Sequence, residues 1–327
     1  MNALVPFALS AAVCALLLWL LLRYAGARLP LDLPNSRSLH AQPVPRVGGV
    51  GVLAALAVAA AAGFVPFGLL LALAFALGAV SFVDDLHRLP TGVRLAAHLA
   101  ASAAIVWYIL SPMQLLELSL IILGVAWITN LYNFMDGSDG LAGGMSIAGF
   151  GAYAIAASLT GDGPIALTAA AIVGASAAFL AFNFPPARIF LGDVGSIPLG
   201  FLAGALGVIG WRNDDWPLWF PLLAFAPFIG DATLTLLKRL LRRERVWHAH
   251  REHYYQRMVR MGLGHRRTAL IAYALMATCV AAALYARAEG PDLQTAVFAL
   301  VTTLLVAVAL WVDFRWARFC RAAGSPT

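Results

Sequence analysis

Long apolar stretches, separated by short polar segments, make up most of the chain. A membrane-spanning helix needs roughly 20 mostly apolar residues, and these stretches are rich in Ala and Leu without the alternation of a barrel strand. The pattern predicts an all-α polytopic membrane protein of about eleven transmembrane helices, in a single domain over 1–327. The expected spans are 3–22, 48–65, 67–83, 93–110, 115–131, 144–160, 164–182, 196–211, 216–237, 268–286 and 293–312.

Composition agrees with this class. The chain has 327 residues, of which 61% are hydrophobic and 12% are charged, and its mean hydropathy is +0.82. A soluble domain carries about 25% charged residues. The three cysteines show no metal-binding or redox spacing, so we expect them to be buried small hydrophobes.

Basic residues test the topology. Eleven spans place alternate loops on opposite sides, and 20 of the 22 Lys and Arg residues fall on one side. Because cytoplasmic loops carry the Lys and Arg excess, we expect the N-terminus outside and the C-terminus in the cytoplasm. The first apolar run follows no basic residue, so we interpret it as an uncleaved span. The basic segments are 23–47, 84–94, 183–195, 238–267 and the C-terminal tail.

Clusters of carboxylate and amide residues stand at the predicted cytoplasmic ends of the spans. Carboxylates beside a membrane-embedded helix end are costly unless they are paired, hydrated or bound to metal. Three such clusters on one face therefore predict one composite site. The clusters are Asp84 with Asp85, Asn133 with Asp136 and Asp139, and Asn183 with Asp193.

Each cluster also has a purely structural interpretation. Adjacent helical residues point about 100° apart, so Asp84 and Asp85 would have different roles, or would simply pair with Arg88 or Arg94. Asp193 stands between two glycines before a new span and would either face a ligand or cap that helix.

Two basic segments face the same side. Arg37, His40 and Arg46 precede the second span, and Arg side chains match phosphate geometry. The loop at about 238–267 carries ten basic and two acidic residues, which would attract anionic headgroups or a nucleotide phosphate. The alternatives are a positive-inside anchor for the first segment and a membrane-associated amphipathic loop for the second.

Together these parts fit phosphoryl transfer between a soluble nucleotide and a membrane lipid. Carboxylates that hold Mg²⁺ typically share it with substrate phosphates, and basic side chains stabilise the diphosphate charge. The chain has no nucleophile elbow, HExxH or Walker A motif.

The motifs resemble those of the polyprenyl-phosphate N-acetylhexosamine-1-phosphate transferases (glycosyltransferase family 4), the superfamily that includes phospho-MurNAc-pentapeptide translocase. The resemblance covers essentially the whole chain, and the motifs occur in family order. They are PVPR.GG at 43–49, VDD at 83–85, N..N..DG.DGLA at 130–142, FN..PA.IF.GD.GS at 182–196, P...D at 227–231 and a His-bearing last cytoplasmic loop.

This resemblance implies transfer of a sugar 1-phosphate from a UDP-sugar to undecaprenyl phosphate at the cytoplasmic face of the bacterial inner membrane, with release of UMP. It implies Mg²⁺, for which Mn²⁺ can substitute, and it allows a homodimer; no nucleic-acid partner is expected. Asp84 would position the lipid phosphate or act as a base beside Asp85, and Asp193 would be the principal metal ligand, with Asp85 as a second. The substrate contacts would come from Arg37, His40, Arg46, Asn133, Asp136, Asp139, Asn183, His250 and His253.

One departure concerns the sugar. The family's last loop usually reads H.HH, whereas HYYQR occupies 253–257, so Tyr255 and Gln256 replace two histidines, or His250 and His253 act together. This argues against the MurNAc-pentapeptide branch and favours a modified N-acetylhexosamine, such as a 6-deoxy sugar for an O-antigen or another surface glycan. The alternatives are the MurNAc-pentapeptide transferase and, from another class, an ion-coupled transporter.

Overall fold

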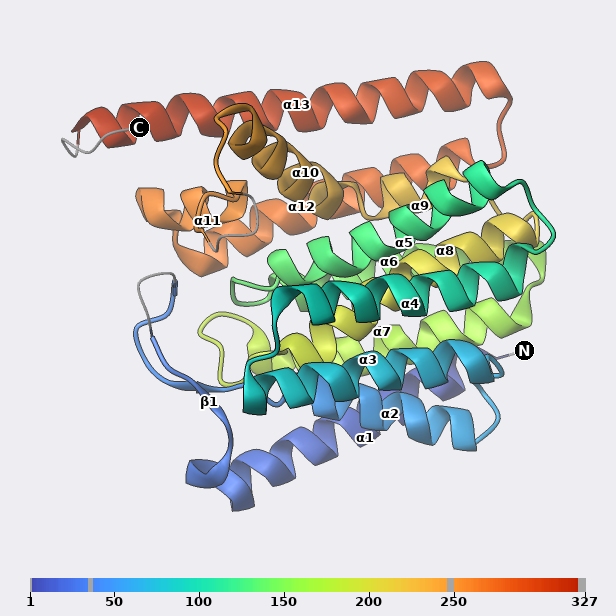
Figure 1. Ribbon diagram of the computed structural model, residues 1–327, viewed down its shortest axis with the longest axis horizontal. Helices are drawn as coiled ribbons and strands as arrows, with labels where there is room; N and C mark the ends of the chain where they lie inside the picture. Colours follow the sequence, from blue (N-terminus) through green and yellow to red (C-terminus); the bar gives the residue numbers. More distant parts are fainter. Residues whose placement is uncertain (1, 35–37, 246–249, 323–327) are drawn as a thin grey trace.

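The computed structural model describes residues 2–34, 38–245 and 250–322, and most of them are helical (Figure 1). The long helices lie side by side across the molecule. Short π-helical or 3₁₀ turns follow α1 and precede α12. The α-helices are α1 (Leu4–Leu20), α2 (Gly48–Ala61), α3 (Gly68–His87), α4 (Thr91–Leu110), α5 (Leu115–Phe134), α6 (Leu141–Thr160), α7 (Gly163–Asn183), α8 (Asp193–Arg212), α9 (Trp219–Ala224), α10 (Ala226–Leu241), α11 (Tyr254–Met258), α12 (Gly264–Ala286) and α13 (Pro291–Ala322).

Every predicted span contains a helix, and nine helical segments of the described chain are long and apolar enough to cross a membrane. The all-α prediction is therefore confirmed, whereas the count of eleven crossings stays a prediction. Helix α2 has 14 residues, about 21 Å at 1.5 Å per residue, against a hydrocarbon core of roughly 30 Å. The expected span 216–237 is divided at Phe225 into α9 and α10, because Pro227 in the first turn of α10 has no N–H to continue α9.

Helix α8 forms the centre of the bundle. Within its apolar window 89% of the residues are buried, and it packs against α3, α4 and α5. A Cβ at Gly200 would lie 2.9 Å from the carbonyl oxygen of Ile128 in α5. Small residues at such positions let two membrane helices approach closely, which fixes the start of α8 beside the end of α5.

A short β-ribbon packs against the start of α8. Strand β1 (Leu31–Asp32) pairs antiparallel with β2 (Val44–Pro45). The backbone of Phe190 then donates to the carbonyl of Pro45 at 2.8 Å and accepts from Gly48 at 2.9 Å. These bonds hold the segment that carries Arg46 against the loop that precedes α8.

The polar connections gather at one end of the bundle (Figure 1). The β-ribbon, the α3–α4 turn, the α5–α6 and α7–α8 loops and α11 all lie there, as does the end of α13. The start of α1 lies at the other end. The three predicted polar clusters therefore come together at the end that carries most of the basic residues.

Candidate active site

A polar cavity of about 340 Å³ opens at this end of the bundle. Its wall comes from the N-terminal segment, the α5–α6 and α7–α8 loops, and the chain from His250 to the start of α12. Eight predicted site residues line it: His40, Arg46, Asn133, Asp136, Asp139, Asn183, Asp193 and His250. Arg37 lies outside the described residues.

Asp193 and Asp85 meet at Arg46. Asp193 is the first residue of α8 and follows Gly192, whose φ of +71° favours glycine. The Arg46 Nη2 atom lies 3.1 Å from Asp193 Oδ1 and 3.6 Å from Asp85 Oδ1. Burial alone would lower the pKa of the Arg46 guanidinium, but the carboxylates of Asp193 and Asp85 raise it above its usual value. Arg46 is therefore a fixed cation between the two predicted metal ligands.

Asp84 faces a different set of partners. Its Oδ1 accepts a 2.6 Å hydrogen bond from the backbone N–H of Leu89, and its Oδ2 pairs with Arg94 at 3.2 Å. Asp84 thus holds the α3–α4 turn, as the helix-end interpretation proposed. The structure brings Asp85, rather than Asp84, to the Arg46–Asp193 pair.

The α5–α6 loop supplies two further carboxylates. Burial and the Asp193 carboxylate raise the pKa of Asp136 well above its usual value, and a hydrogen bond from the Gly192 backbone opposes this rise. Asp139 accepts from the backbone N–H of Ala187 at 3.0 Å. Asp136 therefore lies near the Arg46–Asp193 pair but favours its neutral form, and Asp139 joins the α5–α6 loop to the α7–α8 loop.

The two predicted asparagines are largely committed to holding the loops. Asn183 is buried, accepts from the Gly140 backbone at 2.8 Å and donates to the carbonyl of Ile189 at 2.8 Å. The Asn133 side chain accepts from the Ser196 hydroxyl at 2.8 Å. Both residues border the cavity and fix the backbone around it.

The two histidines of the last loop occupy different environments. His250 lines the cavity, where burial and the neighbouring His253 ring lower its pKa to about 4, so the imidazole is neutral near pH 7. His253 is 3% exposed, caps α11, and places its Nδ1 3.2 Å from Asp231. The wall position expected for His253 is taken by Tyr255 and Gln256, which both line the cavity.

Like Asp32, His265 lines the cavity although no motif indicated it. It stands in the first turn of α12, where its ring contacts Ser138, Asp139 and the carbonyl of Leu39. The feature of the sequence that could have pointed to His265 is its position, 12 residues after His253 in a Gly-rich stretch. Nothing in the order of motifs shows that α12 returns to the cavity.

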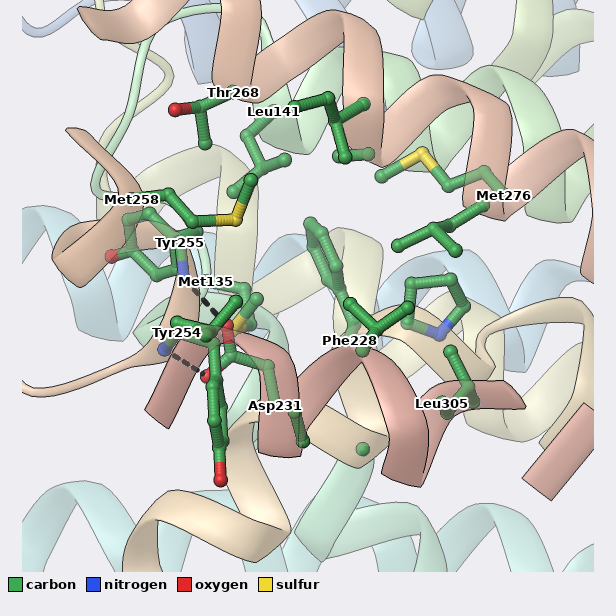
Figure 2. A pocket seen from close by; sticks show the side chains of 18 of the residues that line it. Met135, Leu141, Phe228, Asp231, Tyr254, Tyr255, Met258, Thr268, Met276 and Leu305 are labelled. Carbon is green, nitrogen blue, oxygen red and sulfur yellow. Dashed lines mark hydrogen bonds between the residues drawn. The ribbon is translucent and has the colours of Figure 1, made fainter. Parts of the chain in front are cut away.

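Figure 2 shows an apolar cavity of about 80 Å³, which shares Tyr255 with the polar one. Side chains of α10, α12 and α13, among them Phe228, Met276 and Leu305, line it. At its polar edge Asp231 accepts from the backbone N–H groups of Tyr254 and Tyr255, each at 2.9 Å. Tyr255 lines both cavities, so it forms part of the wall between them.

The carboxylates suit a hard divalent cation. Asp193 and Asp85 pair with Arg46, and together with Asp32 and Asp136 they raise its pKa. Mg²⁺ also binds such groups of carboxylate oxygens. Over residues 2–34, 38–245 and 250–322, no three His, Cys, Asp or Glu side chains form a ready metal-binding group. An ion here would need water or substrate oxygens to complete its shell, as is usual for Mg²⁺ at phosphate sites.

Comparison with known proteins adds to this geometry. The sequence profile of Glycosyl transferase family 4 matches residues 67–211, from α3 to α8. The chain is 27% identical to the "Probable undecaprenyl-phosphate N-acetylglucosaminyl 1-phosphate transferase" of Bacillus subtilis, over 74% of this chain and 73% of that protein. It is 28% identical to the decaprenyl-phosphate N-acetylglucosaminephosphotransferase of Mycolicibacterium smegmatis, over 73% and 71%. A shorter match, 41% identical over 28% of each chain, is to the phospho-N-acetylmuramoyl-pentapeptide-transferase of Halalkalibacterium halodurans.

Proposed function

The chain belongs to glycosyl transferase family 4, and on that premise we propose that it transfers an N-acetylhexosamine 1-phosphate from a UDP-sugar to undecaprenyl phosphate. The observation that carries the proposal is the cluster of Asp85, Arg46 and Asp193, of which Arg46 and Asp193 line a polar cavity. The names of its relatives in two bacteria supply the acceptor class, a polyprenyl phosphate, and the transferred group. The protein would act at the cytoplasmic face of the bacterial inner membrane.

The reaction is a displacement at phosphorus. An oxygen of the lipid phosphate forms a bond to the β-phosphorus of the UDP-sugar, and the bond from that phosphorus to the bridging oxygen breaks. The products are the lipid diphosphate sugar and UMP. We propose direct attack by the lipid phosphate, without an aspartyl-phosphate intermediate.

The position of each residue suggests its role in binding the metal, the phosphates or the sugar. Asp193 and Asp85 would hold Mg²⁺, which supplies charge neutralisation at the diphosphate. Arg46 sits between them as a fixed guanidinium with the planar geometry that suits phosphate oxygens. His40 and His250 line the same cavity and would contact the phosphates or the sugar.

The acceptor lipid has an apolar site beside the polar one. The wall that Tyr255 shares between the two cavities would let an isoprene unit lie among α10, α12 and α13 while the lipid phosphate reaches the carboxylates. The apolar cavity is small, so it would hold only the end of the polyprenyl chain nearest the phosphate. The rest of the chain would lie in the bilayer.

The sugar pocket supports a modified N-acetylhexosamine. Tyr255 and Gln256 bring hydrogen-bonding groups without charge to the cavity wall, where the related pattern has histidines. We propose a neutral N-acetylhexosamine, such as a 6-deoxy sugar, for an O-antigen or another surface glycan. The transporter alternative receives no support from the carboxylates, which lie at helix ends rather than at the membrane midplane where transporters bind their substrates.

Asp193→Asn tests the site. We expect purified wild-type protein with undecaprenyl phosphate and Mg²⁺ to release UMP from at least one donor in a panel of UDP-N-acetylhexosamines, and the variant to lose at least about 100-fold of that rate. The matched control is Asp292→Asn, which should retain full activity. Asp292 is an exposed carboxylate in the first turn of α13, whose start lies at the opposite end of the bundle. Near-wild-type turnover of Asp193→Asn would contradict the site assignment, and absence of UMP from every donor would contradict the proposed reaction.

A further inference from the structure

His265 connects three segments that are far apart in the sequence. It follows Gly264, whose φ of +68° turns the chain into α12. Its side chain is 20% exposed and faces the polar cavity. From this position the ring reaches the α5–α6 loop on one side and the segment that contains Leu39 and His40 on the other.

The two ring nitrogens of His265 contact different partners. The Nδ1 atom lies 2.9 Å from the Ser138 hydroxyl and 3.3 Å from the backbone nitrogen of Asp139. The Nε2 atom lies 3.2 Å from the carbonyl oxygen of Leu39. One side chain therefore links residues 39, 138 and 139 through separate hydrogen bonds.

These contacts fix the tautomer. A carbonyl oxygen only accepts, so Nε2 carries the proton and donates to Leu39. The backbone N–H of Asp139 only donates, so Nδ1 is unprotonated and accepts from Asp139 and from the Ser138 hydroxyl. The tautomer with its proton on Nε2 satisfies these three hydrogen bonds, and the Asp139 Oδ1 atom lies 3.5 Å from Nδ1.

The segments that His265 joins carry predicted ligands of the diphosphate. His40 follows Leu39 directly; its ring packs on Phe190 at 5.0 Å, and its buried Nε2 has no hydrogen-bond partner within the described part of the chain. On the other side, Asp136 and Asp139 belong to the loop that His265 holds. Without His265, neither Leu39 nor Ser138 has a side-chain link of this kind across the cavity in the described chain.

We propose that His265 is a positioning residue of the donor pocket, which fastens the Leu39–His40 segment to the Asp136–Asp139 loop in the geometry that binds the nucleotide diphosphate. The proposal rests on the transferase function proposed above. Because His265 acts through the residues it holds, its loss should weaken donor binding more than it slows the chemical step.

Three variants test this role. His265→Ala removes every contact, and we expect the KM for the UDP-sugar to rise about tenfold while kcat stays within about threefold. His265→Gln keeps one acceptor and one donor on a side chain of similar reach, so its KM should return to within about threefold of wild type. Arg266→Ala, an exposed neighbour in the same turn, is the control and should match wild type.

Amide hydrogen exchange tests whether His265 holds the two segments together, and it does not depend on enzyme activity. In His265→Ala the amide of Asp139 loses its acceptor, so peptides over 136–141 and 38–41 should exchange faster while the interior of α12 does not change. His265→Gln should restore the wild-type rate.

The outcomes are distinct. An unchanged KM in His265→Ala, or faster exchange throughout α12 with a parallel loss of kcat, would overturn the positioning role. If wild-type protein releases no UMP from any donor, the proposed function fails and the donor role fails with it, and exchange still reports whether His265 links the two segments.

Discussion

Asp84 and Asp85 are adjacent in the sequence, but their carboxylates contact different partners. Asp84 bonds the Leu89 backbone and Arg94, whereas Asp85 faces Arg46 across from Asp193. The roughly 100° between successive helical side chains makes this division unavoidable at the end of α3. The direction that each one faces depends on where α4 and the β-ribbon lie, which the local sequence does not contain.

A second carboxylate pair lies at the opposite end of the bundle. Asp215 is 5% exposed and accepts from the Thr160 hydroxyl, and Asp162 accepts from Asn213 at 2.8 Å. Burial and the neighbouring Asp162 raise the pKa of Asp215 to about 6, although the Thr160 bond lowers it. The raised pKa means that the folded protein binds a proton here more tightly than the unfolded chain does.

Asp215→Asn should therefore stabilise the protein at alkaline pH. The stabilisation from the protonated carboxyl is complete below about pH 4 and is lost as the pH rises through about 6. At pH 8 the uncharged Asn should raise the free energy of unfolding by about 1–2 kcal/mol, and below pH 4 the gain should vanish. Thermal unfolding in detergent from pH 4 to pH 8 measures this; an equal shift at every pH would refute the assigned cause.

At the scale of helices, the close packing of α5 against α8 determines where Asn133 and Asp193 lie relative to each other. Helix α5 ends beside Asn133 and α8 begins at Asp193, and the two meet at Gly200. A Cβ there would lie 2.7 Å from Tyr132 Cβ and 2.9 Å from Thr129 Cα. These atoms are backbone or next to it, so the helices would have to separate.

Gly200→Ala should lower both stability and activity. Overpacking of this kind costs about 1–3 kcal/mol, and it would move Asp193 relative to Asn133. Gly124→Ala on the same α5 is the matched control, because a Cβ there meets nothing within 4 Å. Thermal unfolding and UMP release should both fall for Gly200→Ala alone, and equal effects in the two variants would exclude the close helix contact as the cause.

At the scale of the molecule, the polar loops and most basic residues share one end. The described start of α1 and the end of α13 lie at opposite ends of the bundle (Figure 1), as an odd number of crossings requires. From the excess of Lys and Arg at that end we expect the polar cavity to face the cytoplasm.

Cysteine labelling tests this orientation. Cys14, Cys279 and Cys320 are buried, so background labelling should be low. An impermeant maleimide should label Asp292→Cys in intact spheroplasts and should label Arg251→Cys only after permeabilisation. Both residues are exposed; Asp292 is in the first turn of α13 and Arg251 shortly precedes α11, and these two elements' starts lie at opposite ends of the bundle. The reverse pattern would place the cavity outside and rule out a cytoplasmic UDP-sugar donor.

Hydropathy and motif order indicated the class, the approximate place of every long helix and the family, but not α11, which lies in the segment expected to be a loop. They could do so because a spanning helix must be apolar over its length and because the polar residues that remain are costly unless they have a role or a partner. The same cost of unpaired polar residues allowed eight of the cavity-lining residues to be predicted from the sequence.

Only the tertiary structure decided which of these side chains face one another. It turned Asp85 toward Asp193 and Asp84 toward Arg94, buried His253 against Asp231, and brought His265 to the cavity. Each outcome depends on contacts between segments far apart in the chain. A helix's neighbours set the direction of its polar side chains, and the local sequence does not specify those neighbours.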